Sequence, residues 1–165
     1  MEDLKQYIKT VPDFPVEGIL YRDIQPLLAN KRAFEDALDI MTDLIDTPFD
    51  EIDYVVGIEA RGFIVGAALA WLLNTGFKMI RKPGKLPGNN LQRVDYKYEY
   101  SQGSLEMEMG EGKVIIIDDV YATGGTMEAA EELANGCGYD VIDKICLLDI
   151  GLVKDHDVKC VITYE

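Results

Sequence analysis

The sequence predicts an α/β protein in which helices flank a central parallel sheet. Candidate strands and helices follow one another in the order strand, helix, strand, hairpin, strand, helix, strand. This order is typical of a parallel sheet, because a helix must return the chain between parallel strands. The hairpin is predicted from two alternating segments, Asp95–Tyr100 and Leu105–Met109, on either side of Ser101-Gln102-Gly103-Ser104. We therefore expect an antiparallel flap inserted into a parallel sheet.

The N-terminal region contains one irregular stretch and one helix. Residues 11–28 hold three prolines and a glycine among apolar residues, so we expect an ordered loop that wraps without regular structure. Asn30 is a suitable N-cap for a helix from Lys31 to about Asp46, in which apolar side chains recur at helical spacing.

The remaining elements follow in order, and we expect residues 1–165 to form a single domain. Phe63–Asn74 is apolar nearly all round, as expected of a helix packed against a sheet. The other predicted elements are strands Ile52–Ile58, Phe77–Ile80, Val114–Ile117, Val141–Ile150 and Val158–Tyr164, and a helix from about Thr126 to Asn135. Ligands of such sheets bind beyond the carboxyl ends of the strands. The polar turns after Ile58, Ile80 and Ile117 are therefore expected to lie along one edge.

Composition excludes several classes of partner. The chain has 165 residues and a formal net charge of −14, which argues against binding nucleic acid or an anionic membrane surface, since both require excess Lys and Arg. No run approaches the length of a membrane span, and the N-terminus lacks the apolar core of a secretory signal. Three cysteines without a CxxC motif imply neither a disulfide framework nor a thiolate zinc site. We expect a cytoplasmic protein with reduced thiols.

Positive charge is concentrated in one segment. Between Lys78 and Lys97 the chain has six basic residues and one acidic residue, so this window carries +5 and the rest −19. An acidic protein with one basic segment is suited to a small, localised anion rather than to a long polyanion. The alternative interpretation of these residues is a solvated charged loop.

The most informative segment is Val114–Thr126, with the sequence VIIIDDVYATGGT. A buried strand leads to Asp118 and Asp119, and a turn of small residues follows directly into a helix. The backbone N–H groups of such a turn can surround a phosphate at the helix N-terminus, and the two carboxylates can accept hydrogen bonds from a sugar diol. The segment lacks the GxxxxGK[ST] pattern, and each GxG sequence in the chain precedes a predicted strand instead of opening a helix, so neither a Walker loop nor a dinucleotide fingerprint is predicted. A solvated acidic turn before a capped helix is the alternative.

This segment resembles the phosphoribosyl-pyrophosphate signature of the type I phosphoribosyltransferases. FPVEGILYRDIQPLL, VGIEARGFIVGAALA and IRKPGKLPG resemble three further segments of the adenine-specific members, in the same order along most of the chain. The resemblance implies the type I phosphoribosyltransferase fold, with a five-stranded parallel sheet, a flexible β-hairpin loop and an N-terminal hood segment. It also implies a homodimer, Mg²⁺ bound mainly through the substrate, and the conversion of adenine and phosphoribosyl pyrophosphate to AMP and pyrophosphate.

The resemblance implies a role for each matching residue. Asp118 and Asp119 would hold the ribose hydroxyls, and Ala122, Thr123, Gly124, Gly125 and Thr126 would hold the 5′-phosphate. Pyrophosphate would be bound by Arg61, Arg81, Lys82 and Lys85, and the purine base by Leu20, Tyr21, Arg22 and Ile150. Glu99 would transfer a proton at the purine imidazole nitrogen.

The chain departs from the family pattern at several positions. Tyr21 stands where the family usually has Phe, and it keeps an aromatic ring for stacking. Tyr98 stands where the family has Leu, Ser101 where it has Gly, and Tyr121 where it normally has Leu. His156, the only histidine, lies in a polar run and is expected at the surface. Two other functions stay open: transfer to hypoxanthine, xanthine or guanine, and a non-catalytic regulator that binds phosphoribosyl pyrophosphate.

Overall fold

The structure is a computed structural model that describes residues 3–98 and 101–164. Its contacts divide the chain into two compact units, Met1–Ile40 and Met41–Glu165, and the division falls inside helix α2 (Lys31–Asp43). Each unit is described by itself. No helix of the described residues combines the length and apolarity needed to cross a membrane.

The N-terminal unit is more regular than its sequence predicts. Its further elements are a 3₁₀ helix (Leu4–Tyr7), β1 (Lys9–Pro12), β2 (Leu20–Asp23) and α1 (Gln25–Ala29). β1 and β2 form an antiparallel ladder in which Thr10 is paired with Arg22, so the expectation of a loop without regular structure was wrong.

The prolines explain how these elements form. Pro12 is the last residue of β1, Pro15 lies between the two strands, and Pro26 lies in the first turn of α1, where a missing N–H costs nothing. The predicted cap is confirmed, since the Ala33 N–H donates to Asn30 Oδ1 at 3.0 Å. Helix α2 ends at Asp43, three residues before the predicted end.

The C-terminal unit has the predicted parallel sheet. Its strand order is β4-β3-β7-β8-β9, and every neighbouring pair is parallel. The elements are a 3₁₀ helix (Phe49–Glu51), β3 (Tyr54–Ile58), α3 (Gly62–Leu72), β4 (Gly76–Ile80), β5 (Leu91–Tyr98), β6 (Ser101–Glu108), β7 (Gly112–Tyr121), α4 (Gly125–Gly136), β8 (Tyr139–Asp149) and β9 (Lys159–Thr163). All three cysteines are free; Cys137 and Cys146 are buried and Cys160 is half-buried.

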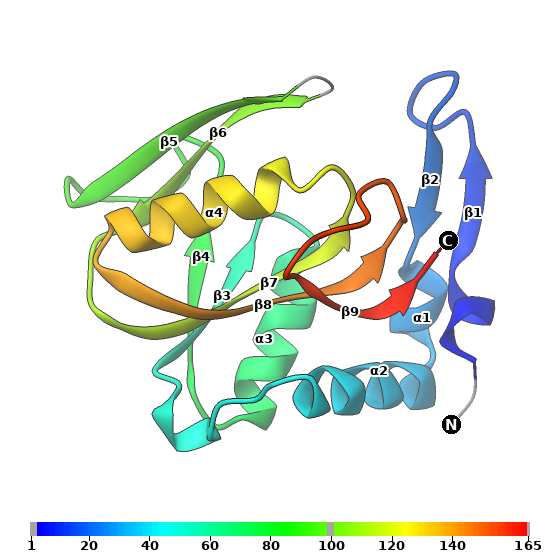
Figure 1. The fold of residues 1–165 in the computed structure, drawn as a ribbon, viewed down its shortest axis with the longest axis horizontal. Coiled ribbons are helices and arrows are strands. Elements are labelled where there is room, and N and C mark those ends of the chain that lie inside the picture. Colours follow the sequence, from blue (N-terminus) through cyan, green and yellow to red (C-terminus); the bar gives the residue numbers. More distant parts are fainter. Residues whose placement is uncertain (1–2, 99–100, 165) are drawn as a thin grey trace. The chain divides into compact units, whose positions relative to one another are not determined.

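Helices cover both faces of this sheet. Gly57 and Ile117 lie against Gly66 of α3, whereas Val56 and Ile116 share a buried cluster with Leu133 and other residues of α4. Successive strand residues point to opposite faces, so α3 and α4 lie on opposite sides. The hairpin β5–β6 lies on the α4 side (Figure 1) and packs against α4.

The hairpin exists, but its strands are longer than predicted. β5 and β6 pair in antiparallel register from Leu91↔Glu108 to Tyr98↔Ser101, so the predicted turn at 101–104 is strand. Gly103 is paired with Tyr96, and a Cβ at residue 103 would lie 2.7 Å from the Tyr96 hydroxyl oxygen. The glycine that suggested a turn is therefore needed for a close cross-strand approach.

Candidate active site

A cavity of about 730 Å³ lies at the carboxyl edge of the parallel sheet. The predicted meeting of three turns at one edge is confirmed, because the cavity is lined by residues that follow β3 and β4 and by the end of β7. The hairpin contributes one wall. Residues that line the cavity include Glu59, Arg61, Lys82, Tyr96, Ser104, Asp118, Asp119, Ala122 and Thr126.

The acidic pair stands at the end of β7, inside the cavity. The Asp118 carboxylate accepts from the Asp119 N–H at 2.9 Å, and Arg61 Nε lies 2.8 Å from Asp119 Oδ2. Burial raises the pKa of both carboxyls; the charge of Asp119 raises that of Asp118 further, whereas Arg61 opposes the rise at Asp119. Arg61 is thus an internal counter-charge for this acidic pair.

The predicted phosphate loop, residues 122–126, directly follows β7. β7 ends at Tyr121, α4 begins at Gly125, and Gly124 between them has φ +86°, a conformation that glycine adopts without strain. Asp118, Thr123, Gly124 and Thr126 line a second cavity of about 150 Å³ here. The first N–H groups of a helix have no partner within the helix, and the helix dipole favours an anion at this end, as a phosphate site requires.

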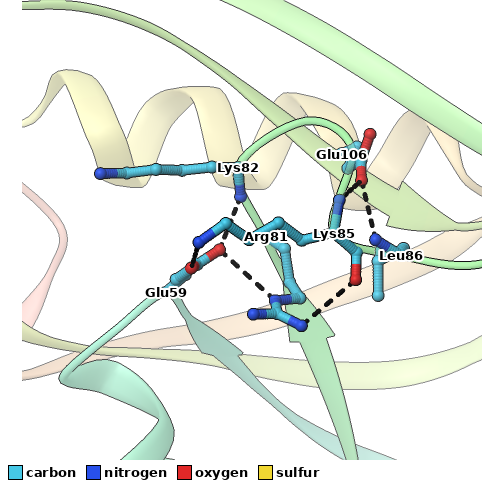
Figure 2. Close-up of polar contacts among 6 residues, drawn as sticks. All are labelled: Glu59, Arg81, Lys82, Lys85, Leu86 and Glu106. Atoms are coloured by element: carbon cyan, nitrogen blue, oxygen red, sulfur yellow. Dashed lines mark hydrogen bonds and ion pairs between the residues drawn. The ribbon is translucent and has the colours of Figure 1, made fainter.

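The basic loop is the connection between β4 and β5, residues 81–90. The pyrophosphate-binding residues predicted on it surround Glu59, which directly follows β3 (Figure 2). Its Oε2 accepts from the Lys82 N–H at 2.8 Å and pairs with Arg81 Nε at 3.4 Å, while its Oε1 accepts from Lys85 Nζ at 3.0 Å. Burial alone would raise the pKa of Glu59, but these three donors lower it from 4.5 to about 2. Three of the four residues predicted to bind pyrophosphate, Arg81, Lys82 and Lys85, are thus held by one carboxylate, that of Glu59. The fourth, Arg61, pairs with Asp119 instead.

A second carboxylate, Glu106 on β6, holds the same loop from the other side. Its Oε1 accepts from the N–H groups of Lys85 and Leu86 at 3.1 Å each (Figure 2), and the backbones of Arg81 and Glu106 exchange hydrogen bonds. The bond from Leu86 leads the causes that lower the pKa of Glu106. The loop therefore has a defined conformation, unlike a solvated charged loop.

Glu59 makes stability depend on pH. A carboxyl whose pKa is lowered on folding stabilises the protein above its unfolded pKa, and this stabilisation is lost as pH falls through the folded value. Between pH 4.5 and about pH 2, the thermal midpoint of wild type should therefore fall more steeply than that of Glu59→Gln. Scanning calorimetry at several pH values measures both slopes.

Glu35→Gln is the matched control for this prediction. Glu35 forms an exposed ion pair with Lys31 at 3.7 Å, of a kind that contributes little, so its variant should keep the wild-type slope. Parallel slopes for wild type and Glu59→Gln would contradict the prediction.

The predicted base-binding residues fall in two units. Leu20, Tyr21 and Arg22 belong to β2 of the N-terminal unit, whereas Ile150 directly follows β8 and donates its N–H to Tyr121 O at 3.1 Å. Their joint role in base binding stays a prediction. Glu99 lies outside the described residues, and its role also stays a prediction.

Several features escaped the sequence analysis. Tyr96 and Ser104 line the large cavity, but their strand alternation carries no signal that identifies a ligand contact. The peptide bond between Glu59 and Ala60 is cis, which the sequence does not indicate. His156 was wrongly expected at the surface: its side chain is 14% exposed and packs on Tyr121, because the ring covers an apolar neighbour.

The carboxylates do not form a metal site by themselves. Among the described residues, no group of three or more His, Cys, Asp or Glu side chains is placed to hold a metal ion. Asp118 and Asp119 offer oxygen atoms of the kind that Mg²⁺ prefers. This donor set fits an ion whose remaining ligands come from a bound substrate and water.

An α/β sheet with an acidic pair, a small-residue loop and clustered basic side chains at one edge is suited to a phosphorylated sugar. Residues 23–164 match the family described as Phosphoribosyl transferase domain. The chain belongs to this phosphoribosyltransferase family.

Several relatives of the chain have names that specify adenine as the base. A protein of Hydrogenovibrio crunogenus named adenine phosphoribosyltransferase is 46% identical, with 98% of this chain and 96% of that protein covered. The crystal structure of adenine phosphoribosyltransferase from Thermoanaerobacter pseudethanolicus has a TM-score of 0.88 at 33% identity over 98% of both chains. The Giardia lamblia structure, described as APRTase complexed with 9-deazaadenine, has a TM-score of 0.87 at 34% identity over 99% of this chain and 97% of that one. These relatives resemble the chain along nearly its whole length.

Proposed function

We propose that the chain transfers the 5-phosphoribosyl group from phosphoribosyl pyrophosphate to adenine, releasing pyrophosphate and forming AMP in purine salvage. One observation carries the proposal: a single cavity brings Asp118 and Asp119 together with the phosphate loop and the basic loop. A ribose diol, a 5′-phosphate and a pyrophosphate are the three groups that this arrangement complements. The names of the relatives support adenine as the acceptor.

Different residues bind the three parts of phosphoribosyl pyrophosphate. Residues 122–126 bind the 5′-phosphate at the N-terminus of α4, and Asp118 and Asp119 accept hydrogen bonds from the ribose hydroxyls. Arg61, Arg81, Lys82 and Lys85 bind the pyrophosphate and stabilise the negative charge that grows on it as the C1′–O bond breaks. Mg²⁺, bound through the pyrophosphate and diol, would neutralise part of that charge.

Binding requires the basic side chains to change partners. Glu59 pairs with Arg81 and Lys85, and Asp119 with Arg61. The incoming pyrophosphate replaces these carboxylates as the partner of the cations. The internal carboxylates hold the cations in place beforehand, which reduces the conformational entropy lost on binding.

Glu99 is the proposed proton-transfer residue at the purine imidazole nitrogen. Replacing it by Gln keeps the shape of the side chain but removes the carboxyl group that can accept and donate a proton, so kcat should fall about 100-fold or more, within the range of acid–base contributions. The KM for phosphoribosyl pyrophosphate should stay within about threefold of wild type, because no phosphate group is expected to contact Glu99. Steady-state kinetics with both substrates varied measures the two constants. Unchanged turnover with intact binding would remove the proposed role.

Adenine is favoured over the other purines by the comparisons. The Giardia lamblia relative was crystallised with 9-deazaadenine, an adenine analogue, and neither another base nor a non-catalytic regulator is favoured. A competition assay with equal concentrations of adenine, hypoxanthine, xanthine and guanine tests the choice. AMP should be the main nucleotide formed; a predominance of IMP, XMP or GMP would overturn the assignment to adenine.

Three further properties complete the proposal. Residues 1–165 act as one phosphoribosyltransferase domain, the enzyme works in the cytoplasm, and it forms a homodimer. Helix α3 offers apolar surface for such a dimer, since Ile64, Trp71 and Leu72 are exposed and Trp71 is 81% so. Light scattering coupled to gel filtration tests the dimer.

A further inference from the structure

We propose that Tyr121 and His156 are positioning residues for the phosphate loop, with the imidazole of His156 holding the Tyr121 hydroxyl against Gly124. The inference rests on the proposed function, because it assigns to this pair the geometry of the 5′-phosphate site. Tyr121 directly precedes the loop formed by residues 122–126.

The Tyr121 side chain supports the loop at its turn. Tyr121 is 5% exposed and lines the 150 Å³ cavity together with Thr123 and Gly124. Its hydroxyl oxygen lies 2.7 Å from the place that a Cβ at residue 124 would occupy. The Tyr121 hydroxyl therefore packs closely against Gly124, and displacement of the Tyr121 ring would remove this contact from the turn.

His156 fixes the ring of Tyr121. The two ring centroids are 4.2 Å apart, with an angle of 39° between the planes, which is a close aromatic contact. His156 is held in turn by Asp149, whose Oδ2 lies 3.3 Å from Nε2. Asp149 is anchored at the end of β8, since its Oδ1 accepts from the Gly151 N–H at 2.8 Å. The contacts thus run from β8 through two rings to the phosphate loop.

The Tyr121 hydroxyl keeps its proton and can therefore donate a hydrogen bond. Burial, with the charge of Glu128 as the next cause, raises the pKa of Tyr121, so the phenol stays protonated at neutral pH. Ile150, the proposed base-binding residue nearest in sequence, does not depend on the Tyr121 ring, because its N–H donates to the backbone oxygen of Tyr121. We therefore expect effects on phosphate binding without equal effects on adenine binding.

Kinetics of His156→Ala and His156→Phe test the pair. His156→Ala should raise the KM for phosphoribosyl pyrophosphate about 3- to 10-fold, the range expected for one lost aromatic contact. Its kcat and its KM for adenine should stay within about twofold of wild type. His156→Phe keeps a ring against Tyr121 and should restore the KM to within about twofold, within the scatter of such comparisons.

A binding measurement separates this proposal from the proposed function. The Kd of ribose 5-phosphate, measured by calorimetry, should rise in His156→Ala by the same factor as the KM. If wild type formed no AMP but this loss of binding remained, the proposed function would fail and the positioning role would stand. Wild-type Kd and KM in His156→Ala would overturn the role, as would a His156→Phe variant as impaired as His156→Ala.

Two other variants guard against a general loss of stability. Tyr121→Phe keeps the stack but removes the hydroxyl, and should raise the Kd of ribose 5-phosphate even if His156→Ala folds poorly; an unchanged Kd would contradict the role of the hydroxyl. Tyr54→Leu removes an aromatic pair with Tyr139 at 6.2 Å, away from the loop. It should lower the thermal midpoint and leave ribose 5-phosphate binding unchanged, and weakened binding there would show that stability alone explains the effects.

Discussion

Arg61→Ala is expected to lower kcat/KM for phosphoribosyl pyrophosphate about 100-fold or more. Arg61 Nε lies 2.8 Å from Asp119 Oδ2, and the Asp119 side chain is only 8% exposed. Removing one partner of a fully buried charge pair typically costs about 2–5 kcal/mol. Because the Arg61 side chain is 34% exposed, solvent screens this pair and its own loss costs less. The lost cation is also a proposed pyrophosphate ligand, which adds to the effect. Without it the pKa of Asp119 should rise further, because burial already raises it and Arg61 opposes that rise.

Steady-state kinetics with phosphoribosyl pyrophosphate varied measures this effect. Arg61→Lys keeps a charge but not the planar guanidinium, so it should recover only part of the loss. Lys113→Ala is the control, because its ion pair with Glu51 is equally short at 2.7 Å but exposed on both sides. A KM and kcat within threefold of wild type in Arg61→Ala would contradict the assignment.

Gly124→Ala is expected to weaken binding of phosphoribosyl pyrophosphate about 10- to 100-fold and to lower the free energy of unfolding by about 1–3 kcal/mol. Two causes act together. The φ of +86° strains any residue with a Cβ, and that Cβ would lie 2.7 Å from the Tyr121 hydroxyl oxygen. Because His156 packs on the tyrosine ring, the ring cannot move aside freely and the loop must shift. Calorimetric titration and denaturant unfolding measure the two quantities.

Gly18→Ala separates these causes. Gly18 has a nearly identical φ of +87°, but nothing lies within 4 Å of its added Cβ, so this variant should lose stability through backbone strain and keep its affinity. In a double-mutant cycle, Tyr121→Phe should relieve part of the Gly124→Ala penalty by removing the crowded oxygen. Wild-type affinity in Gly124→Ala would show that the turn does not form the phosphate site.

Much of the central sheet was predictable from the sequence because β3 and the middle of β7 are apolar runs that lead into polar turns. Val114–Ile117 is fully buried, and Asp118 and Asp119 follow it at the cavity, as expected. The order of elements implied parallel strands, and parallel strands end at one edge. The cavity position therefore follows from local patterns alone.

Other features depend on contacts between distant residues. Gly103 suggested a turn, but it lies opposite Tyr96 across the hairpin, a pairing that local sequence does not specify. The prolines of residues 11–28 indicated a loop, although each stands where a strand end, a connection or a first helical turn tolerates it. The hydrogen bonds between Glu59 and a loop more than 20 residues away could not be predicted either. A single glutamate in a turn does not indicate which distant residues it will contact.

Incubation of labelled adenine with phosphoribosyl pyrophosphate and Mg²⁺ tests the central claim most directly. AMP and pyrophosphate should appear in equal amounts, with no product when phosphoribosyl pyrophosphate is omitted. Failure to form AMP above the blank at any pH would contradict the proposed transfer to adenine.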